Sequence, residues 1–220
     1  MFTESRLKSF VLRKGRITLN QKHAIETFWD QYVLNEKDDI DEFLENKHSV
    51  LDIGFGAGET TTYLAKNMPN SSILGAEVYL SGIGSTLSKS NEEKLNNIKI
   101  LNDDIVPFLE EKVADNSFDI VLMFYPDPWP KRKHHKRRLF QEEFVNLVYK
   151  KLKKDGLFYF KTDWSHYYEE ANKLLFNSQH WRVLKDIQLD DVLIDLPQTS
   201  FERKALQAER KLNKIILQKI

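Results

Sequence analysis

The stretch that decides the fold is Val50-Leu51-Asp52-Ile53-Gly54-Phe55-Gly56-Ala57-Gly58-Glu59, in which a short apolar run leads into a glycine-rich turn. Such a turn between a strand and a helix lets a ligand approach bare backbone, and the helix start supplies unpaired N–H groups. Gly54, Gly56 and Gly58 follow a G-x-G-x-G spacing, and Glu59 stands where a dinucleotide fingerprint would need glycine. The Asp52 carboxylate would suit a sulfonium group. These residues predict a site for S-adenosylmethionine rather than NAD, unless the glycines only let helix and strand pack closely.

Short apolar runs recur along the chain and alternate with segments of helical spacing; the runs are 49–53, 71–77, 98–101, 118–125, 157–162 and 181–187. Runs of this kind are typical of parallel strands covered by helices. With a last strand in KLNKIILQK, the sequence predicts an α/β fold: a doubly wound, mostly parallel, seven-stranded sheet with helices on both faces. Helices are expected over 21–33 and 138–153, with Gly156 placed to stop the second.

Length and composition exclude several classes of protein. The chain has 220 residues, 33 Lys and Arg against 33 Asp and Glu, and no cysteine, so disulfides, thiolate metal sites and cysteine nucleophiles are excluded. It contains no stretch of about 18 apolar residues, which predicts a cytoplasmic protein without a membrane partner. We expect one domain over 1–220, with an N-terminal basic segment and helices over 1–48 and a Rossmann-like core over 49–220.

Acidic residues end the next two predicted strands. Glu77 lies 19 residues after Gly58, near the offset at which an acid accepts the hydroxyls of an adenosine ribose. Asp104, after the third strand, is placed to accept a hydrogen bond from the adenine amino group. Either acid could instead cap a helix or sit in a solvated turn, and for its neighbour Asp103 this alternative is favoured.

The fourth strand leads into a proline-rich loop, Tyr125-Pro126-Asp127-Pro128-Trp129-Pro130, followed by KRKHHKRR over 131–138. Three prolines make the loop rigid at the sheet edge where ligands of open α/β folds bind. A basic run beside an aromatic pocket fits neutralisation of RNA phosphates around a stacked base, although a charge run alone is equally often a solvated surface. His134 and His135 lack a partner at a metal-ligand spacing, so no metal site is predicted.

The motifs LDIGFGAG, GAEVY, NDDIVPFL, FYPDPWPKRKHHKRRL, FKTDW and TSFE occur in one order over nearly the whole chain, after the opening SFVLRKGRIT over 9–18. In this the sequence resembles the bacterial tRNA (guanine-N7)-methyltransferases. The resemblance implies a class I methyltransferase fold, S-adenosylmethionine as donor, and a guanine in the tRNA variable loop as acceptor. It further implies cofactor contacts at Asp52, Glu77, Asp104 and Asp127, substrate contacts at Lys131, Asp163, Thr199, Ser200, Phe201 and Glu202, and RNA contacts at Lys133, His134, His135, Lys136, Arg137 and Arg138. Where many members carry Glu, this chain has Asp52.

The later motifs have simpler interpretations from the residues alone. Asp163 could cap a helix that begins near Ser165, and Thr199 with Glu202 forms a capping-box pattern. For the reaction we expect direct attack by guanine N7 on the methyl group, with Asp127 as the catalytic residue that stabilises the developing charge and Asp163 as support. The alternatives are a methyltransferase acting on an exocyclic amine and a non-catalytic RNA-binding protein.

Overall fold

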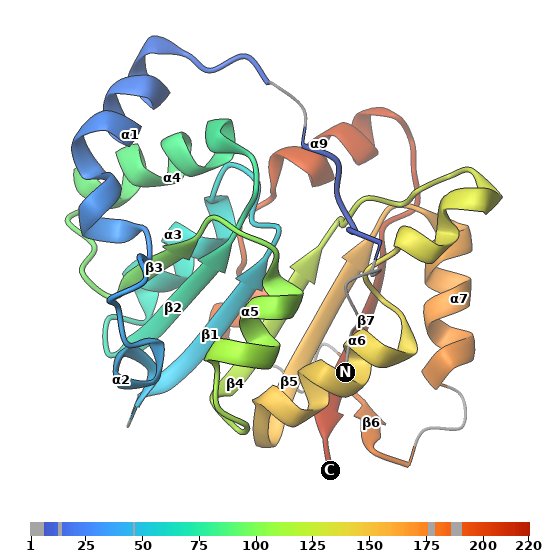
Figure 1. Ribbon diagram of the computed structural model, residues 1–220. Helices are drawn as coiled ribbons and strands as arrows, with labels where there is room; N and C mark the ends of the chain where they lie inside the picture. Colours follow the sequence, from blue (N-terminus) through green and yellow to red (C-terminus); the bar gives the residue numbers. More distant parts are fainter. Residues whose placement is uncertain (1–6, 13–14, 46, 176–178, 186–190) are drawn as a thin grey trace.

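The computed structural model describes residues 7–12, 15–45, 47–175, 179–185 and 191–220. In this part of the chain the strands are β1 (His48–Ile53), β2 (Ser71–Ala76), β3 (Ile98–Leu101), β4 (Phe118–Phe124), β5 (Leu152–Thr162), β6 (Trp181–Val183) and β7 (Asn213–Lys219). They form one sheet in the order β3-β2-β1-β4-β5-β7-β6 (Figure 1). The predicted run 181–187 becomes strand only over Trp181–Val183, and its residues 186 and 187 lie outside the described residues.

Strands β1 to β5 run in parallel, and β7 is the strand that runs in the opposite direction. β1 pairs in parallel with β2 and β4, β2 with β3, and β4 with β5, while β7 runs antiparallel to both β5 and β6. The predicted mostly parallel, seven-stranded sheet is therefore confirmed, and KLNKIILQK supplies its last strand, β7.

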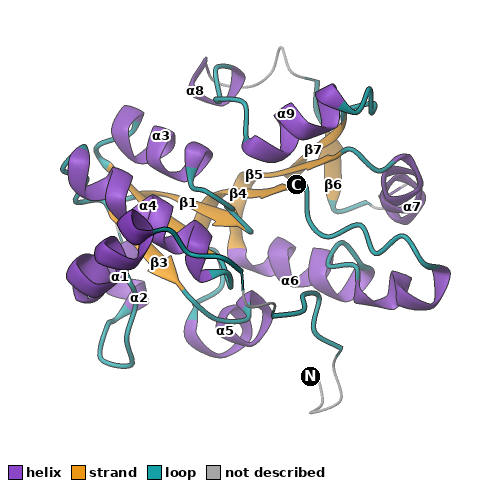
Figure 2. Ribbon diagram, turned by 90° about the horizontal axis from the view of Figure 1, so that it is seen from above, coloured by secondary structure: helices purple, strands orange, loops and turns teal. Residues whose placement is uncertain are grey.

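Helices cover both faces of the sheet (Figure 2). Their bounds are α1 (Leu19–Tyr32), α2 (Ile40–Leu44), α3 (Glu59–Asn67), α4 (Leu80–Glu92), α5 (Ile105–Lys112), the 3-10 helix η1 (Arg132–Arg137), α6 (Glu142–Lys151), α7 (Ser165–Leu175), α8 (Asp191–Ile194) and α9 (Ser200–Gln207). One buried apolar cluster joins the sheet to α2, α5, α6 and α7, and the other joins it to α1, α3, α4 and α8. Consecutive strand residues alternate between these clusters: Val50 belongs to the second and Leu51 to the first.

The predicted helix over 138–153 is wrong at both ends. Residues 132–137 form η1, α6 begins at Glu142, and Leu152 already belongs to β5. Gly156 does not stop a helix: the pairs Phe118 with Leu152 and Ile120 with Leu157 leave residues 153–156 bulging opposite one residue of β4. A Cβ on Gly156 would lie 2.9 Å from the Lys153 carbonyl oxygen, so glycine lets this bulge close.

The order of the strands places two loops side by side. The chain passes from β1 outward through β2 to β3, then crosses back so that β4 lies on the other side of β1. The loops that follow β1 and β4 therefore leave the same edge of the sheet at the point where the winding reverses. Ligands of open α/β sheets bind at such a point.

Candidate active site

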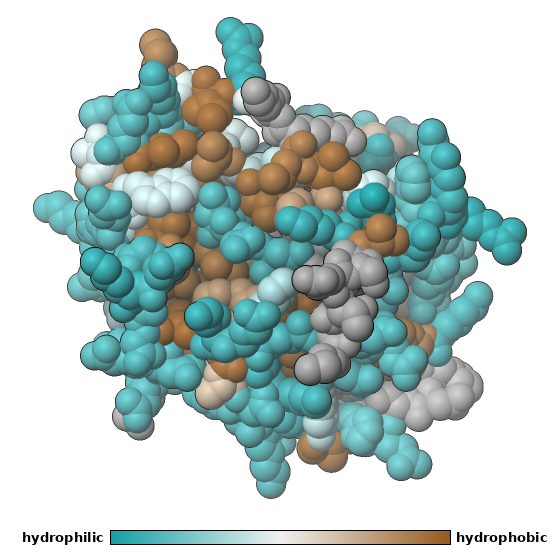
Figure 3. All heavy atoms as spheres, viewed as in Figure 1, coloured by the Kyte–Doolittle hydropathy of each residue, from teal (hydrophilic) through white to brown (hydrophobic). Residues whose placement is uncertain are grey.

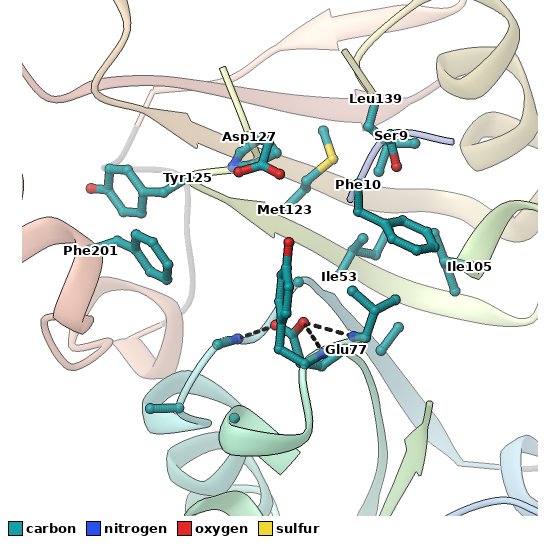
Figure 4. A pocket seen from close by; sticks show the side chains of 18 of the residues that line it. Ser9, Phe10, Ile53, Glu77, Ile105, Met123, Tyr125, Asp127, Leu139 and Phe201 are labelled. Atoms are coloured by element: carbon teal, nitrogen blue, oxygen red, sulfur yellow. Dashed lines mark hydrogen bonds between the residues drawn. The ribbon is translucent and has the colours of Figure 1, made fainter. Parts of the chain in front are cut away.

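A cavity of about 360 Å³ opens at the carboxyl ends of β1, β2 and β4 (Figure 4). This volume lies in the range of roughly 300–1,000 Å³ that is usual for small-molecule sites. The residues that line it come from the glycine-rich turn, from the segments after β2 and β3, from the loop after β4 and from α9; they include Gly54, Gly56, Glu77, Asp103, Asp104, Tyr125, Asp127 and Phe201. Many of the residues predicted from the sequence are thus gathered around one cavity.

The glycine-rich turn has a backbone that only glycine adopts easily. Gly54, Gly56 and Gly58 have φ of 71°, 61° and 76°. Helix α4 packs directly against this turn, because a Cβ on Gly82 would lie 2.1 Å from the Gly56 carbonyl oxygen. Lys89 of α4 also donates to the Ala57 carbonyl oxygen at 3.0 Å. The turn is therefore held in shape from behind while its other side borders the cavity.

Glu77 is fixed by backbone amides on both carboxylate oxygens. Oε2 accepts from the amide of Gly56 at 2.9 Å, and Oε1 accepts from those of Val78 at 2.7 Å and Tyr79 at 3.0 Å (Figure 4). Burial raises the pKa of Glu77, and these three hydrogen bonds oppose that rise. A carboxylate has about four lone-pair sites, so Glu77 keeps acceptor capacity for hydroxyl groups of a ligand in the cavity.

Asp104, and not Asp103, is the helix cap. The Asp104 side chain accepts from the amide of Val106 at 3.2 Å at the start of α5, and Asp103 accepts from the amide of Asp104 at 2.6 Å. Both acids line the cavity. The expected contact of Asp104 with adenine stays a prediction, and capping does not exclude it because a carboxylate has further acceptor sites.

Asp52 lies behind the glycine-rich turn rather than along the large cavity. It is 2% exposed, accepts a hydrogen bond from the Thr61 hydroxyl at 2.7 Å, and borders a smaller pocket with Phe55 and Phe124. Burial raises the pKa of Asp52 to about 7. Its expected contact with the cofactor stays a prediction.

The loop after β4 carries Asp127 between two strained residues. Tyr125 has φ of 52° and Trp129 has φ of 44°, values that are uncommon for bulky side chains. In Figure 4 the Asp127 carboxylate faces the cavity, and the Tyr125 ring lies beside Phe201 of α9. Asp127 also borders a second pocket, of about 320 Å³, that includes Tyr79, Pro128 and Trp129. One carboxylate therefore stands between the large cavity and an aromatic pocket.

Of the residues predicted to hold the substrate, Phe201 lines the large cavity, and Thr199 borders the smaller pocket beside Asp52. Asp163 forms an ion pair with Arg210 at 2.7 Å, and the Thr162 hydroxyl, rather than Asp163, accepts the amide of Trp164 just before α7. Thr199 accepts the amide of Glu202 at 3.1 Å, as expected of the first residue of a capping box. Ser200 is the first residue of α9. The next residue, Phe201, is 48% exposed, and its ring lies against Gly56 at the cavity.

The basic segment 131–138 is not a uniform surface. Lys131, Lys133 and Lys136 are exposed, and His134 and His135 are half-buried. Partial desolvation and the neighbouring cations lower the pKa of His134. In contrast, Arg137 donates to the Lys8 carbonyl oxygen at 3.1 Å, and Arg138 is only 3% exposed. The expected RNA contacts stay predictions, and the burial of Arg138 gives it a different environment from the rest.

Comparison with known proteins places this site in a family. A family model described as "Putative methyltransferase" matches residues 46–215. A tRNA (guanine-N(7)-)-methyltransferase of Yersinia enterocolitica is 38% identical over 82% of this chain and 77% of its own. One of Francisella philomiragia is 34% identical over 97% of this chain and 95% of its own. The chain belongs to the tRNA (guanine-N7)-methyltransferase family.

Solved structures show the fold that this family member shares with other methyltransferases. An rRNA methylase from Streptococcus thermophilus has a TM-score of 0.53 at 12% identity, covering 85% of this chain and 99% of its own. A "SAM dependent methyltransferase" from Aquifex aeolicus has a TM-score of 0.52 at 13% identity, covering 92% of this chain and 100% of its own. The Rossmann-like class I methyltransferase fold expected from the sequence is confirmed.

In this tRNA (guanine-N7)-methyltransferase family member, an N-terminal segment also borders the cavity; its sequence, SFVLRKGRIT, shares the family resemblance, but no role in the site was predicted for it. Ser9 and Phe10 line the cavity. Three side chains hold this segment by its carbonyl oxygens: Trp129 Nε1 donates to Ser9 at 2.9 Å, Tyr79 to Val11 at 2.9 Å, and Arg137 to Lys8. These bonds use backbone acceptors, which every residue has, so no sequence signal could have revealed them.

Two further features concern the hydropathy of the protein. Figure 3 shows hydrophobic atoms gathered over the upper part of one face, around α1 and α4, and mainly hydrophilic atoms below. Exposed hydrophobic residues of these helices include Leu19 in α1 and Leu80 in α4. No helix in the described part of the chain has both the length and the apolar character needed to span a membrane.

Proposed function

We propose that this protein transfers a methyl group from S-adenosylmethionine to N7 of a guanine in the variable loop of tRNA. Membership of the tRNA (guanine-N7)-methyltransferase family supports this function. The observation that carries it in the structure is the position of Asp127, which borders both the cofactor-sized cavity and the aromatic pocket beside the basic segment. A methyl donor in the first and a base in the second would meet at this carboxylate.

The cavity fits S-adenosylmethionine. Glu77 offers a fixed carboxylate for ribose hydroxyls, and Gly54 and Gly56 of the glycine-rich turn border the same cavity. Asp103 and Asp104 border the same cavity and offer acceptors for an adenine amino group. When bound, this cofactor supplies a methyl group activated by its attachment to a sulfonium.

The reaction needs positioning more than proton transfer. Guanine N7 holds a lone pair, which forms the new N–CH₃ bond as the C–S bond breaks and its electron pair passes to sulfur. The guanine ring thereby becomes cationic, and no proton has to be removed first. Asp127 would stabilise this charge as it develops, which lowers the barrier more than it stabilises the bound substrate. Asp163, paired with Arg210, would support the substrate from the segment before α7.

The RNA would lie across the basic segment. Lys131, Lys133 and Lys136 are exposed and would neutralise phosphates, with His134, His135 and Arg137 beside them. Thr199, Ser200, Phe201 and Glu202 would contact the guanine nucleotide from α9. The bonds from Trp129, Tyr79 and Arg137 to the N-terminal segment support one functional domain over 1–220. With tRNA as substrate, we propose a cytoplasmic location.

The test is to incubate the protein with unmodified tRNA and methyl-labelled S-adenosylmethionine, digest the tRNA, and identify the labelled nucleoside. We expect 7-methylguanosine from the variable loop. Label on an exocyclic amine would instead support a different RNA methyltransferase. If no label is transferred and calorimetry detects no binding of S-adenosylhomocysteine, the proposed function is wrong, and the result favours the non-catalytic RNA-binding protein.

A further inference from the structure

Arg138, at the end of the basic segment, turns into the protein instead of toward solvent. It is 3% exposed, although Lys131, Lys133 and Lys136 in the same segment are exposed. Buried arginines normally have partners that compensate for lost hydration. The contacts of Arg138 therefore indicate what it does.

The guanidinium of Arg138 connects the loop after β4 to helix α7. Its Nε donates to the Pro128 carbonyl oxygen at 2.8 Å, and its Nη1 donates to the carboxylate of Glu170. The group also lies 4.7 Å above the ring of Tyr167, which is fully buried in α7. The planar, forked guanidinium can bind both partners at once, whereas an ammonium group on a flexible chain cannot match this geometry.

The loop that contains Pro128 has few backbone donors. Pro126, Pro128 and Pro130 have no backbone N–H, so this segment can anchor itself mainly through carbonyl oxygens and side chains. It also contains the two positive φ values at Tyr125 and Trp129, which persist only where surrounding contacts enforce them. A hydrogen bond to the residue next to Asp127 therefore bears directly on where that carboxylate lies.

A metal site is the other interpretation of this cluster. One ligand atom each of His135, His166 and Glu170 lies within 4.8 Å of the others, a spacing that could hold a metal ion. Sequence spacing offered His135 no such partners; the packing of η1 on α7 brings them together. However, Arg138 Nη1 already lies 3.0 Å from His166 Nδ1 and on the Glu170 carboxylate, and its positive charge repels a cation. The cluster is better explained as the anchor of Arg138.

We propose that Arg138 is a positioning residue for Asp127, and that Glu170 holds Arg138 in place from α7. The inference rests on the proposed function, in which Asp127 acts at the methyl-transfer centre. Arg138 does not contact the RNA phosphates; it fixes the Pro128 carbonyl group, and through it the carboxylate one residue earlier. The basic segment thus combines cations that face RNA with one that sets the geometry of the active site.

The experiment compares Arg138→Lys and Glu170→Gln with Lys136→Ala, a change at an exposed cation of the same segment. For Arg138→Lys and Glu170→Gln we expect kcat to fall about tenfold or more while the tRNA KM stays within about threefold. Lys136→Ala should show the reverse, with a raised tRNA KM and nearly unchanged kcat. Double variants should be non-additive, because Arg138 and Glu170 act through one contact.

A second measurement reports on the loop without activity. Each protein is compared with its Trp129→Phe counterpart, and the difference in fluorescence isolates Trp129, one residue from Pro128. Arg138→Lys and Glu170→Gln should change this signal, and Lys136→Ala should not. The fluorescence measurement tests the inference independently of activity. If the wild-type protein methylates no guanine, the proposed function is wrong, but the fluorescence still decides whether Arg138 and Glu170 position the loop.

Three outcomes would overturn the inference. A raised tRNA KM with wild-type kcat in Arg138→Lys would show that Arg138 contacts RNA. Unchanged kinetics, or an unchanged Trp129 signal, would show that the loop is set by other contacts. If Arg138→Lys fails to fold, as judged by circular dichroism, Glu170→Gln decides on the same criteria, because Glu170 is partly exposed.

Discussion

The glycine-rich turn and the basic segment lie on two sides of Asp127 and are built by different physical means. The turn is shaped by its backbone: Gly54, Gly56 and Gly58 have positive φ angles, and backbone amides hold the Glu77 carboxylate. In the basic segment, side chains of one charge have separate environments, from exposed Lys133 to buried Arg138. The turn has a recognisable sequence because its positive φ angles require glycine at particular positions, whereas the role of a charge in a run depends on what packs against it.

The largest effect is expected at Asp127, where the two regions meet. Asp127→Asn keeps the shape and removes the charge, so kcat should fall about tenfold to a hundredfold, which corresponds to about 1.4–2.7 kcal/mol. Because N7 needs no general base, kcat should show no essential ionisation near neutral pH. Steady-state kinetics over the neutral pH range measure both. Asp30→Asn, at an exposed position in α1, is the matched control.

A wild-type kcat in Asp127→Asn, with only tRNA or cofactor affinity reduced, would make Asp127 a binding residue. The difference between the two regions would then remain, but the carboxylate between them would have no role in charge stabilisation.

The next effect tests the glycine-rich side. Glu77→Gln should weaken binding of S-adenosylhomocysteine by about 1.5 kcal/mol or more, roughly tenfold, because the amide NH₂ would face backbone donors instead of accepting from them. Isothermal titration calorimetry measures this, with exposed Glu110→Gln as control. Unchanged affinity would show that Glu77 only holds the turn and does not bind the cofactor.

A smaller effect concerns Asp52, buried behind the turn. Its pKa is raised from 3.8 to about 7 by burial, so the folded protein binds this proton more tightly than the unfolded chain. Ionised Asp52 therefore lowers the free energy of unfolding increasingly from about pH 4 to pH 7, and fully above that.

Relative to wild type, Asp52→Asn should therefore gain at least about 1 kcal/mol of unfolding free energy between about pH 4 and about pH 8, because the ionised carboxylate is penalised only at the higher pH, whereas the cost of the new buried amide is the same at both. Urea unfolding at the two pH values measures the difference. Equal effects at both would mean that Asp52 does not carry a raised pKa.

The smallest effect belongs to the exposed cations. Lys133→Ser with Lys136→Ser should raise the tRNA KM a few-fold and reduce the slope of log affinity against log salt by about 0.7–0.9 for each phosphate that is no longer neutralised. A control pair, Lys150→Ser with Lys154→Ser, removes two exposed cations near the start of β5. A full salt slope in the first pair would show that these lysines are only solvated.

The sequence by itself determined the sheet, the glycine-rich turn and the acids that follow β2 and β3, because strand burial and turn geometry depend on residues close together in the chain. It misplaced the ends of α6 and the role of Gly156, since the bulge in β5 is set by pairing with β4. Only the tertiary structure decided that Arg138 faces α7, that Asp52 lies behind the turn, and that the segment with Ser9 and Phe10 borders the cavity. These features depend on contacts between residues far apart in the chain, and a run of like charges or a plain backbone carbonyl carries no local pattern that could reveal them.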